Sequence, residues 1–187
     1  MSHTKWRVLD VGCGKGKEPG AVGVDRRRGT AADVVADAAR VPWPFKSDTF
    51  DRIVLKDVLE HLDDVVSVLE EIHRVARPGA EVFVRVPHFS SAHAYGDVTH
   101  RRAFSTESFG HFTGGFPQYD FYSKARFSLQ SVRLNLWKLH RATGVAWIAN
   151  RVPHFYEKYG AFIFPAMNVE FLLRVEKGPS PHHAHRD

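Results

Sequence analysis

The sequence predicts an α/β fold in which a doubly wound, mostly parallel sheet carries a late antiparallel strand. Short apolar runs in the first half alternate with turn-rich or helical stretches, a pattern typical of β-α units that pack into a parallel sheet. The chain has 187 residues, of which 43% are hydrophobic and 25% charged. These values predict one globular domain and exclude wholly disordered, collagen-like and coiled-coil chains.

Each expected strand is a short run of apolar residues that stops at glycine, proline or a polar residue. The runs cover residues 6–11, 21–25, 31–36, 50–57, 81–87, 127–137 and 168–178. The first five are separated by crossovers, as in a parallel sheet, and the last two are the late strands.

Apolar residues at three- and four-residue steps predict a helix between the fourth and fifth strands. They run from Val58 to Val75, and we expect the helix to reach Arg77 before Pro78 ends it. Asp25, at the end of the second strand, follows Gly14 by only eleven residues. Because a crossover helix needs about ten residues of its own, the first one is expected to be shortened or absent.

The second half of the chain changes character after the fifth strand. Residues 88–127 are rich in His, Ser, Gly and aromatic side chains. They predict a segment that covers the acceptor, with an irregular satellite core as the alternative. A helical excursion is expected within residues 138–167 and a mobile tail at 179–187, so that residues 1–178 form a single domain.

The charge balance permits a polyanionic partner without requiring one, since 26 basic and 21 acidic residues give a net charge of +5. Residues 99–141 hold seven Lys or Arg and two acids, which indicates either an anion-binding face or a solvated basic face. The single cysteine, Cys13, cannot form an intramolecular disulfide, and neither a signal peptide nor a membrane-spanning run is apparent. We therefore expect a cytoplasmic protein.

A glycine-rich loop, VLDVGCGKG at residues 8–16, follows the first strand. Gly12, Gly14 and Gly16 allow a tight turn and a close approach of the backbone to a ligand, although dinucleotide sites use similar loops. The carboxylate of Asp10 would repel a pyrophosphate, whereas a ligand with an ammonium group would be attracted.

Two further acids extend this pattern along the same edge of the sheet. Asp25 ends the second strand, where a carboxylate can accept both hydroxyls of a ribose, and Asp37 lies near the end of the third. Three carboxylates favour a phosphate-free sulfonium cofactor over NAD.

Five blocks in order resemble the class I S-adenosylmethionine-dependent methyltransferases, whose fold is Rossmann-like. VLDVGCGKG resembles their first motif, Val24-Asp25 their ribose-binding acid and Ala36-Asp37-Ala38 their adenine-contacting acid. FDRIVLKDVLEHL and IHRVARPGAEVFVRVP resemble their fourth and fifth strand blocks, so the resemblance covers about residues 6–87. It implies an enzyme that binds S-adenosyl-L-methionine and transfers its methyl group.

The short first crossover, KGKEPGAVGVD, resembles a group of small type-11-like methyltransferases within this family. That group is often found among polysaccharide and secondary-metabolite enzymes. The resemblance implies a small-molecule acceptor, such as a secondary metabolite or saccharide, that is methylated on oxygen or nitrogen.

Candidate site residues follow from these motifs. Cofactor-binding candidates lie in the glycine loop and at the ends of strands two to four: Asp10, Gly12, Cys13, Gly14, Asp25, Arg26, Asp37, Ala38 and Lys56. Candidate catalytic groups follow the fourth and fifth strands: Glu60, His61, His88, His93 and His100. Acceptor-binding candidates offer cations for an anionic group or flat apolar walls: Arg101, Arg102, Phe104 and Phe109.

The histidines after the fifth strand raise the question of a metal site. The spacing of His88, His93, Asp97 and His100 matches no fixed ligand spacing, so no metal is expected. The alternatives are an RNA-modifying methyltransferase that uses the basic stretch and a non-catalytic partner that binds an adenosyl cofactor. Neither a nucleic acid nor a membrane is expected as a partner, and the oligomeric state is left open.

Overall fold

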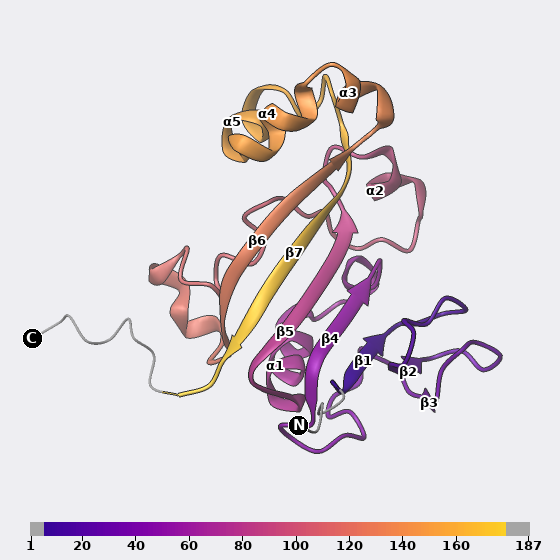
Figure 1. Cartoon of the computed structure of the whole chain (residues 1–187). Coiled ribbons are helices and arrows are strands. Elements are labelled where there is room, and N and C mark those ends of the chain that lie inside the picture. Colours follow the sequence, from indigo (N-terminus) through magenta and orange to yellow (C-terminus); the bar gives the residue numbers. More distant parts are fainter. Residues whose placement is uncertain (1–5, 179–187) are drawn as a thin grey trace, which may run out of the picture.

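The computed structural model describes residues 6–178, apart from the side chains of residues 119 and 120. Seven strands form one sheet in the order β3-β2-β1-β4-β5-β7-β6 (Figure 1). The strands are β1 (Val8–Val11), β2 (Val22–Asp25), β3 (Val34–Val35), β4 (Phe50–Lys56), β5 (Ala76–Pro87), β6 (Arg126–Leu136) and β7 (Ala166–Glu176). The tail expected at residues 179–187 lies outside the described residues.

Strand directions confirm the predicted fold class. Strands β1 to β5 are parallel, whereas β7 is antiparallel to both of its neighbours, β5 and β6. The carboxyl ends of the parallel strands therefore meet at one edge of the sheet, which is where open α/β folds bind ligands.

Helices are concentrated in the second half of the chain. They are α1 (Val65–Val75), α2 (Ala92–Gly96), α3 (Lys138–Ala142), α4 (Val145–Arg151) and α5 (Pro153–Tyr159), with 3-10 turns η1 (Leu59–His61) and η2 (Pro117–Tyr122). The first three crossovers, all within the described residues, contain no helix, which confirms and extends the expectation for the first. Among residues 6–178, no helix is both long and apolar enough to cross a bilayer.

The predicted helix from Val58 to Arg77 is shorter in the structure. Helix α1 begins only after Asp64, whose carboxylate accepts a hydrogen bond from the backbone N–H of Ser67 at 2.9 Å. The preceding residues form the separate turn η1. At the other end, Ala76 already pairs with Phe50 in the sheet, so Pro78 lies within β5 rather than ending the helix.

One face of the sheet carries the hydrophobic core. Alternate residues of the central strands are almost fully buried there: Leu9, Val11, Ile53, Leu55, Val82, Val84, Val86, Val169, Phe171 and Leu173. Helix α1 and the segment after β5 cover this face, as the ring contacts of Phe109 with Phe171 and of His73 with Phe127 show.

The opposite face of the sheet has no helix in front of β4 to β7 (Figure 1) and carries charged side chains beside an apolar row of Val54, Phe83 and Leu172. Its outward residues form charge ladders across neighbouring strands, such as Arg52, Glu81 and Arg174, which occupy adjacent register positions. Arg52 and Glu81 lie 3.9 Å apart as an ion pair. Charged side chains thus flank the apolar row at a place where a doubly covered sheet would have packed helices.

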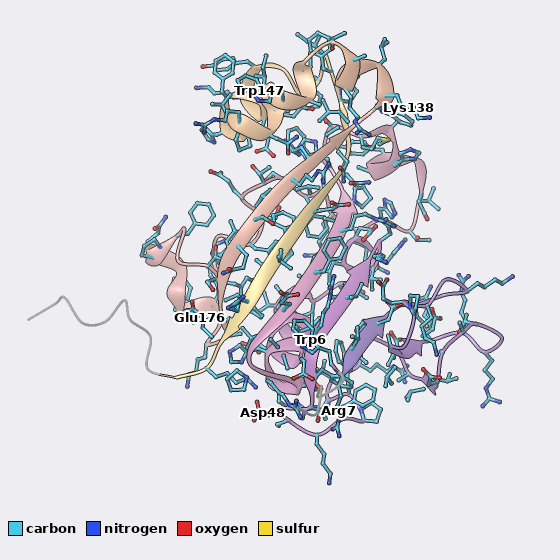
Figure 2. All side chains as sticks on the ribbon, in the orientation of Figure 1. Trp6, Arg7, Asp48, Lys138, Trp147 and Glu176 are labelled. Carbon is cyan, nitrogen blue, oxygen red and sulfur yellow. The ribbon has the colours of Figure 1, made fainter. Side chains whose placement is uncertain are left out.

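The helical segment between β6 and β7 lies at the end of the sheet where the parallel strands have their carboxyl ends. Figure 2 shows Lys138 and Trp147 at this end, opposite Asp48 and Glu176. Helices α3 to α5 therefore lie near the carboxyl ends of the parallel strands.

Candidate functional site

A cavity of about 820 Å³ lies at the carboxyl ends of β1, β2, β3 and β4. It brings together six of the predicted cofactor-binding residues: Gly12, Gly14, Asp25, Arg26, Asp37 and Ala38. Val58 and Leu62 add apolar walls, and Arg27 and Arg28 extend the basic rim that Arg26 begins. The size is that of a pocket for a small organic cofactor.

The glycine loop turns where the structure needs glycine. Gly12 has φ +69° and Gly14 has φ +51°, a region that L side chains rarely adopt. A Cβ on Gly12 would lie 2.5 Å from Cγ2 of Val58, whereas a Cβ on Gly14 would meet no atom within 4 Å. The space beside Gly14 is thus a cradle that a ligand can approach closely, as a nucleoside cofactor requires.

Asp25 is fixed at the rim of this cavity by backbone hydrogen bonds. Its carboxylate accepts from the N–H of Gly14 at 2.9 Å and from the N–H of Arg27 at 2.8 Å. Each carboxylate oxygen has a second lone pair. The side chain can therefore accept ligand hydroxyls without releasing the loop.

Three predicted cofactor-binding residues, Asp10, Cys13 and Lys56, do not line the cavity. Asp10 is buried and accepts the N–H of Glu18 at 2.7 Å, and burial raises the pKa of its carboxyl. Lys56 forms an ion pair with Glu18 at 2.6 Å, and Cys13 is buried beside Gly23. All three support the outer side of the loop.

A second cavity, of about 930 Å³, adjoins the first. It is lined by Asp57, Glu60, His61, Arg85, Pro87, His93, Gly96, Asp97, Val98, His100, Met167 and Asn168. Asp57, His61 and Asp97 line both cavities, so the two spaces meet at these residues. Four predicted catalytic residues, Glu60, His61, His93 and His100, lie in the second cavity.

Glu60 is the unusual carboxylate of the second cavity. Its residue is 1% exposed, and neither carboxylate oxygen has a hydrogen-bond partner among the described residues. Burial, with the nearby charges of Asp57 and Asp97, raises its pKa to about 7. Donor atoms of Glu60, His61 and His100 lie within 4.8 Å of one another, so these residues can hold a metal ion.

His88 has a structural place instead. It is fully buried and lines neither cavity. Nδ1 lies 2.8 Å from Oγ of Ser90, and Nε2 lies 3.1 Å from Oε1 of Glu157. Burial opposes ionisation of Glu157, but hydrogen bonds from His88 and Thr106 outweigh it and hold the pKa of this carboxyl below its ordinary value. The geometry gives His88 no route to an acceptor.

The predicted aromatic walls are part of the core. Phe104 and Phe109 are 4% and 3% exposed, and the ring of Phe109 contacts Phe171 of β7 at 4.6 Å. Their burial corrects the expectation that these rings face the acceptor. The sheet offers a large apolar surface at this place. Burying the two rings against it gives a more favourable free energy than exposing them in a polar cavity. Only the first part of the segment 88–127 borders the site.

The two predicted anion-binding arginines are engaged in internal contacts. Arg101 pairs with Asp63 at 2.6 Å on the rim of the first cavity. Arg102 donates to the carbonyl oxygen of Leu62 at 2.8 Å, which holds the loop before α1. Arg126 likewise donates to the carbonyl oxygen of Ser123 at 2.6 Å. These contacts engage three of the seven basic side chains of residues 99–141, whereas Lys124, Arg133, Lys138 and Arg141 are exposed.

Several site residues have no signal in the sequence. Thr99 donates to Asp97 at 2.7 Å and contacts Nδ1 of His61 at 2.9 Å, so it orients that ring. Met167 and Asn168 enter the second cavity from β7, more than sixty residues further along the chain. Contacts between such distant segments leave no local pattern.

Comparisons with known proteins agree with this architecture. Residues 18–84 match a family model described as a methyltransferase domain. A ubiquinone biosynthesis O-methyltransferase of Hahella chejuensis is 33% identical over an alignment of 98 residues, and the match covers 41% of this chain and 41% of that protein. The matched region thus spans about two fifths of the curated relative.

Solved structures are similar over nearly the whole chain. A SAM-dependent methyltransferase from Archaeoglobus fulgidus has a TM-score of 0.60 at 18% identity, covering 90% of this chain and 86% of that one. A phosphoethanolamine N-methyltransferase from Haemonchus contortus, in complex with S-adenosyl-L-methionine, has a TM-score of 0.53 at 15% identity, covering 92% of this chain and 49% of that one. At these identities the likeness shows the fold.

The burial of Glu60 makes stability depend on pH. With a pKa of about 7 in the folded state and 4.5 as its ordinary value, the folded protein binds the extra proton between these values. Its stability therefore falls as pH rises from about 4.5 to 7. We expect Glu60→Gln, in EDTA-treated protein, to be more stable than the parent at pH 8 by about 1 to 3 kcal/mol and to lose this pH dependence.

Urea unfolding at pH 5 and pH 8 measures the effect. Glu176→Gln, an exposed carboxylate at the end of β7, serves as the control and should follow the parent at both pH values. Equal pH dependence in parent and Glu60→Gln would show that Glu60 ionises normally.

Replacement of His88 should lower stability rather than act on catalysis alone. His88→Ala leaves the buried carboxylate of Glu157 without one of its partners, for a loss of about 2 to 4 kcal/mol in unfolding free energy. His93→Ala, at the cavity surface, should change it by less than about 0.5 kcal/mol. A stable His88→Ala variant with normal cofactor binding and no turnover would restore a catalytic role.

Two glycines of the loop differ in how much room a side chain would have, so their alanine variants should differ in stability. Gly12→Ala forces a side chain into a positive-φ position against Val58, so we expect a loss of about 1 to 3 kcal/mol in unfolding free energy. Gly16→Ala meets open space and should stay within about 0.5 kcal/mol of the parent. Chemical denaturation compares them, and equal losses would contradict the geometry of the loop.

Proposed function

Because the chain has the fold of the class I S-adenosylmethionine-dependent methyltransferases and matches their methyltransferase domain over residues 18–84, we propose that it transfers a methyl group to an oxygen or nitrogen of a small molecule. One observation carries the proposal. The cofactor-sized cavity and the second cavity meet at Asp57, His61 and Asp97. A methyl donor and an acceptor bound in these spaces would face each other at that junction.

The first cavity suits S-adenosylmethionine, which supplies a methyl group on a sulfonium sulfur when bound. The open side of Gly14 lets the backbone approach the cofactor, and the fixed carboxylate of Asp25 is positioned for its ribose hydroxyls. Asp37 and Ala38 are assigned to the adenine end of the cavity. The structural neighbour from Haemonchus contortus, which carries this cofactor, supports the assignment.

The second cavity suits an acceptor that must lose a proton. His61, His93, His100 and Glu60 supply imidazole and carboxylate groups that can accept a proton from the acceptor. In the transfer, a lone pair of the acceptor atom would form a bond to the methyl carbon while the carbon–sulfur bond of the cofactor breaks. The electron pair of the broken bond would stay on sulfur. The enzyme's main task is to hold the two reacting atoms about 3 to 3.5 Å apart.

The curated relative and the second cavity together favour one class of acceptor. The O-methyltransferase relative favours oxygen over nitrogen, and the volume of the second cavity suits a small phenolic, secondary-metabolite or saccharide acceptor. A panel of catechols, phenols, saccharides and amines, with S-adenosylhomocysteine release as the readout, tests it. Cofactor binding without turnover on any acceptor would favour a non-catalytic partner, and turnover on RNA alone would favour the nucleic-acid alternative.

Asp25 provides the sharpest test of the cofactor site. Asp25→Ala should weaken S-adenosylhomocysteine binding by about 1.5 to 3 kcal/mol, because a hydrogen-bonding charged group is removed from the cavity. Isothermal titration calorimetry measures the affinity.

The matched control is Asp33→Ala. Asp33 also anchors a loop, by accepting the N–H of Gly23 at 2.7 Å, but it does not line the cavity. We expect this variant to bind within about threefold of the parent, a change of less than about 1 kcal/mol. Equal losses in both variants would assign Asp25 to loop anchoring only, and unchanged affinity would remove it from the site.

A further inference from the structure

The carboxylate of Glu60 faces the second cavity without a partner. Its residue is 1% exposed, and both oxygens lack a hydrogen bond among the described residues. A buried carboxylate in this state is costly unless a donor or a cation completes it. The carboxylate therefore points to a ligand that the protein chain itself does not supply.

Two imidazoles stand beside this carboxylate. The rings of His61 and His100 are 4.7 Å apart, and one donor atom from each lies within 4.8 Å of the other and of a Glu60 oxygen. The described residues contain no other group of three or more His, Cys, Asp or Glu side chains with this spacing.

Hydrogen bonds fix the tautomer of both rings. The hydroxyl of Thr99 donates its proton to Asp97 at 2.7 Å, so its oxygen can only accept from Nδ1 of His61 at 2.9 Å. Nδ1 of His100 donates to the carbonyl oxygen of Ala94 at 3.1 Å. Both Nε2 atoms are left with a free lone pair. Metal-binding histidines are typically held in this way, by an outer acceptor on the other ring nitrogen.

The backbone holds the three residues in place. Glu60 and His61 belong to η1, directly after β4, and His100 follows α2. The N–H of Arg101 donates to the carbonyl oxygen of Glu60 at 2.8 Å, which ties the two segments together. The arrangement therefore exists before any ion binds.

We propose that Glu60, His61 and His100 bind one divalent first-row transition metal ion, such as Zn²⁺, at the junction of the two cavities. Two imidazoles and one carboxylate suit such an ion and leave coordination positions open, whereas Mg²⁺ and Ca²⁺ prefer oxygen ligands. Asp97, whose Oδ2 lies 4.0 Å from Nε2 of His100, stands next to the site. This proposal replaces the expectation of a metal-free site.

The chemical role that we assign to the ion rests on the proposed methyl transfer and specifies how the acceptor would be activated. Held by Glu60, His61 and His100, the ion would supply a positive charge that favours loss of a proton from an acceptor hydroxyl to water. The acceptor oxygen would form its bond to the methyl carbon as the carbon–sulfur bond breaks, and the electron pair of that bond would stay on sulfur. The acceptor class is thereby narrowed to molecules with an ionisable hydroxyl.

Metal titration tests the site without any acceptor. Untagged full-length protein is treated with EDTA, dialysed and titrated with Zn²⁺ by calorimetry, and with Co²⁺ by visible absorption, which reports imidazole coordination. We expect one ion per chain. Glu60→Gln and His100→Ala should bind at least about 100-fold more weakly, and Thr99→Val, which removes only an outer partner, about 10- to 100-fold more weakly.

Matched controls remove histidines elsewhere. His154→Ala, an exposed residue of α5, and replacement of His182, His183 and His185 in the tail should leave the affinity unchanged. Circular dichroism verifies that each variant is folded, and His61→Ala substitutes for any variant that is not. Zn²⁺ binding by the parent that is no tighter than that of His100→Ala overturns the proposal, as does loss of binding in the control variants.

The two proposals fail in distinguishable ways. His100 does not line the cofactor cavity, so His100→Ala should bind S-adenosylhomocysteine as the parent does. Metal binding in a protein that does not bind S-adenosylhomocysteine would leave the metal site intact and refute the proposed function. S-adenosylhomocysteine binding without a 1:1 metal complex would refute the metal site alone.

Discussion

The amino-terminal half of the molecule depends on backbone N–H groups that aspartate carboxylates satisfy. Its first three crossovers contain no helix, so their amides have no helical partners and each must find an acceptor elsewhere. Asp10 accepts from Glu18, Asp25 from Gly14 and Arg27, and Asp33 from Gly23. Asp25 therefore both lines the first cavity and anchors its glycine loop, while Asp10 and Asp33 anchor neighbouring loop residues without lining the cavity.

A second constraint makes the two cavities meet at the end of β4. Asp57 has φ +58° and forms an ion pair with Arg85 of the neighbouring strand, so the chain turns sharply into η1. That turn places His61 on the boundary of both cavities and buries Glu60 behind it. One tight turn thus sets the place of cofactor, acceptor and proposed metal ion relative to one another.

The sequence predicted those parts of the fold that are encoded locally. Apolar runs identified the strands, and the short spacing before Asp25 predicted the missing first helix. Strand alternation could also have placed Asp10, because Leu9 and Val11 face the core and the side chain between them must face away. By contrast, the close approach of His100 to Glu60 and the burial of Phe109 against β7 depend on contacts between segments that are distant in the sequence, so no local periodicity predicts them.

The charged outer face of the sheet limits how this fold can be remodelled. A helix grafted into the first crossover would have to pack on β1 and β4, yet the outward positions of β4 present the half-exposed Arg52 and Lys56 beside the already buried Asp10. Burying the charges of Arg52 and Lys56 would cost free energy unless each gained a partner. Converting this sheet into one covered by helices on both faces therefore requires new residues on β4 as well as a longer first crossover.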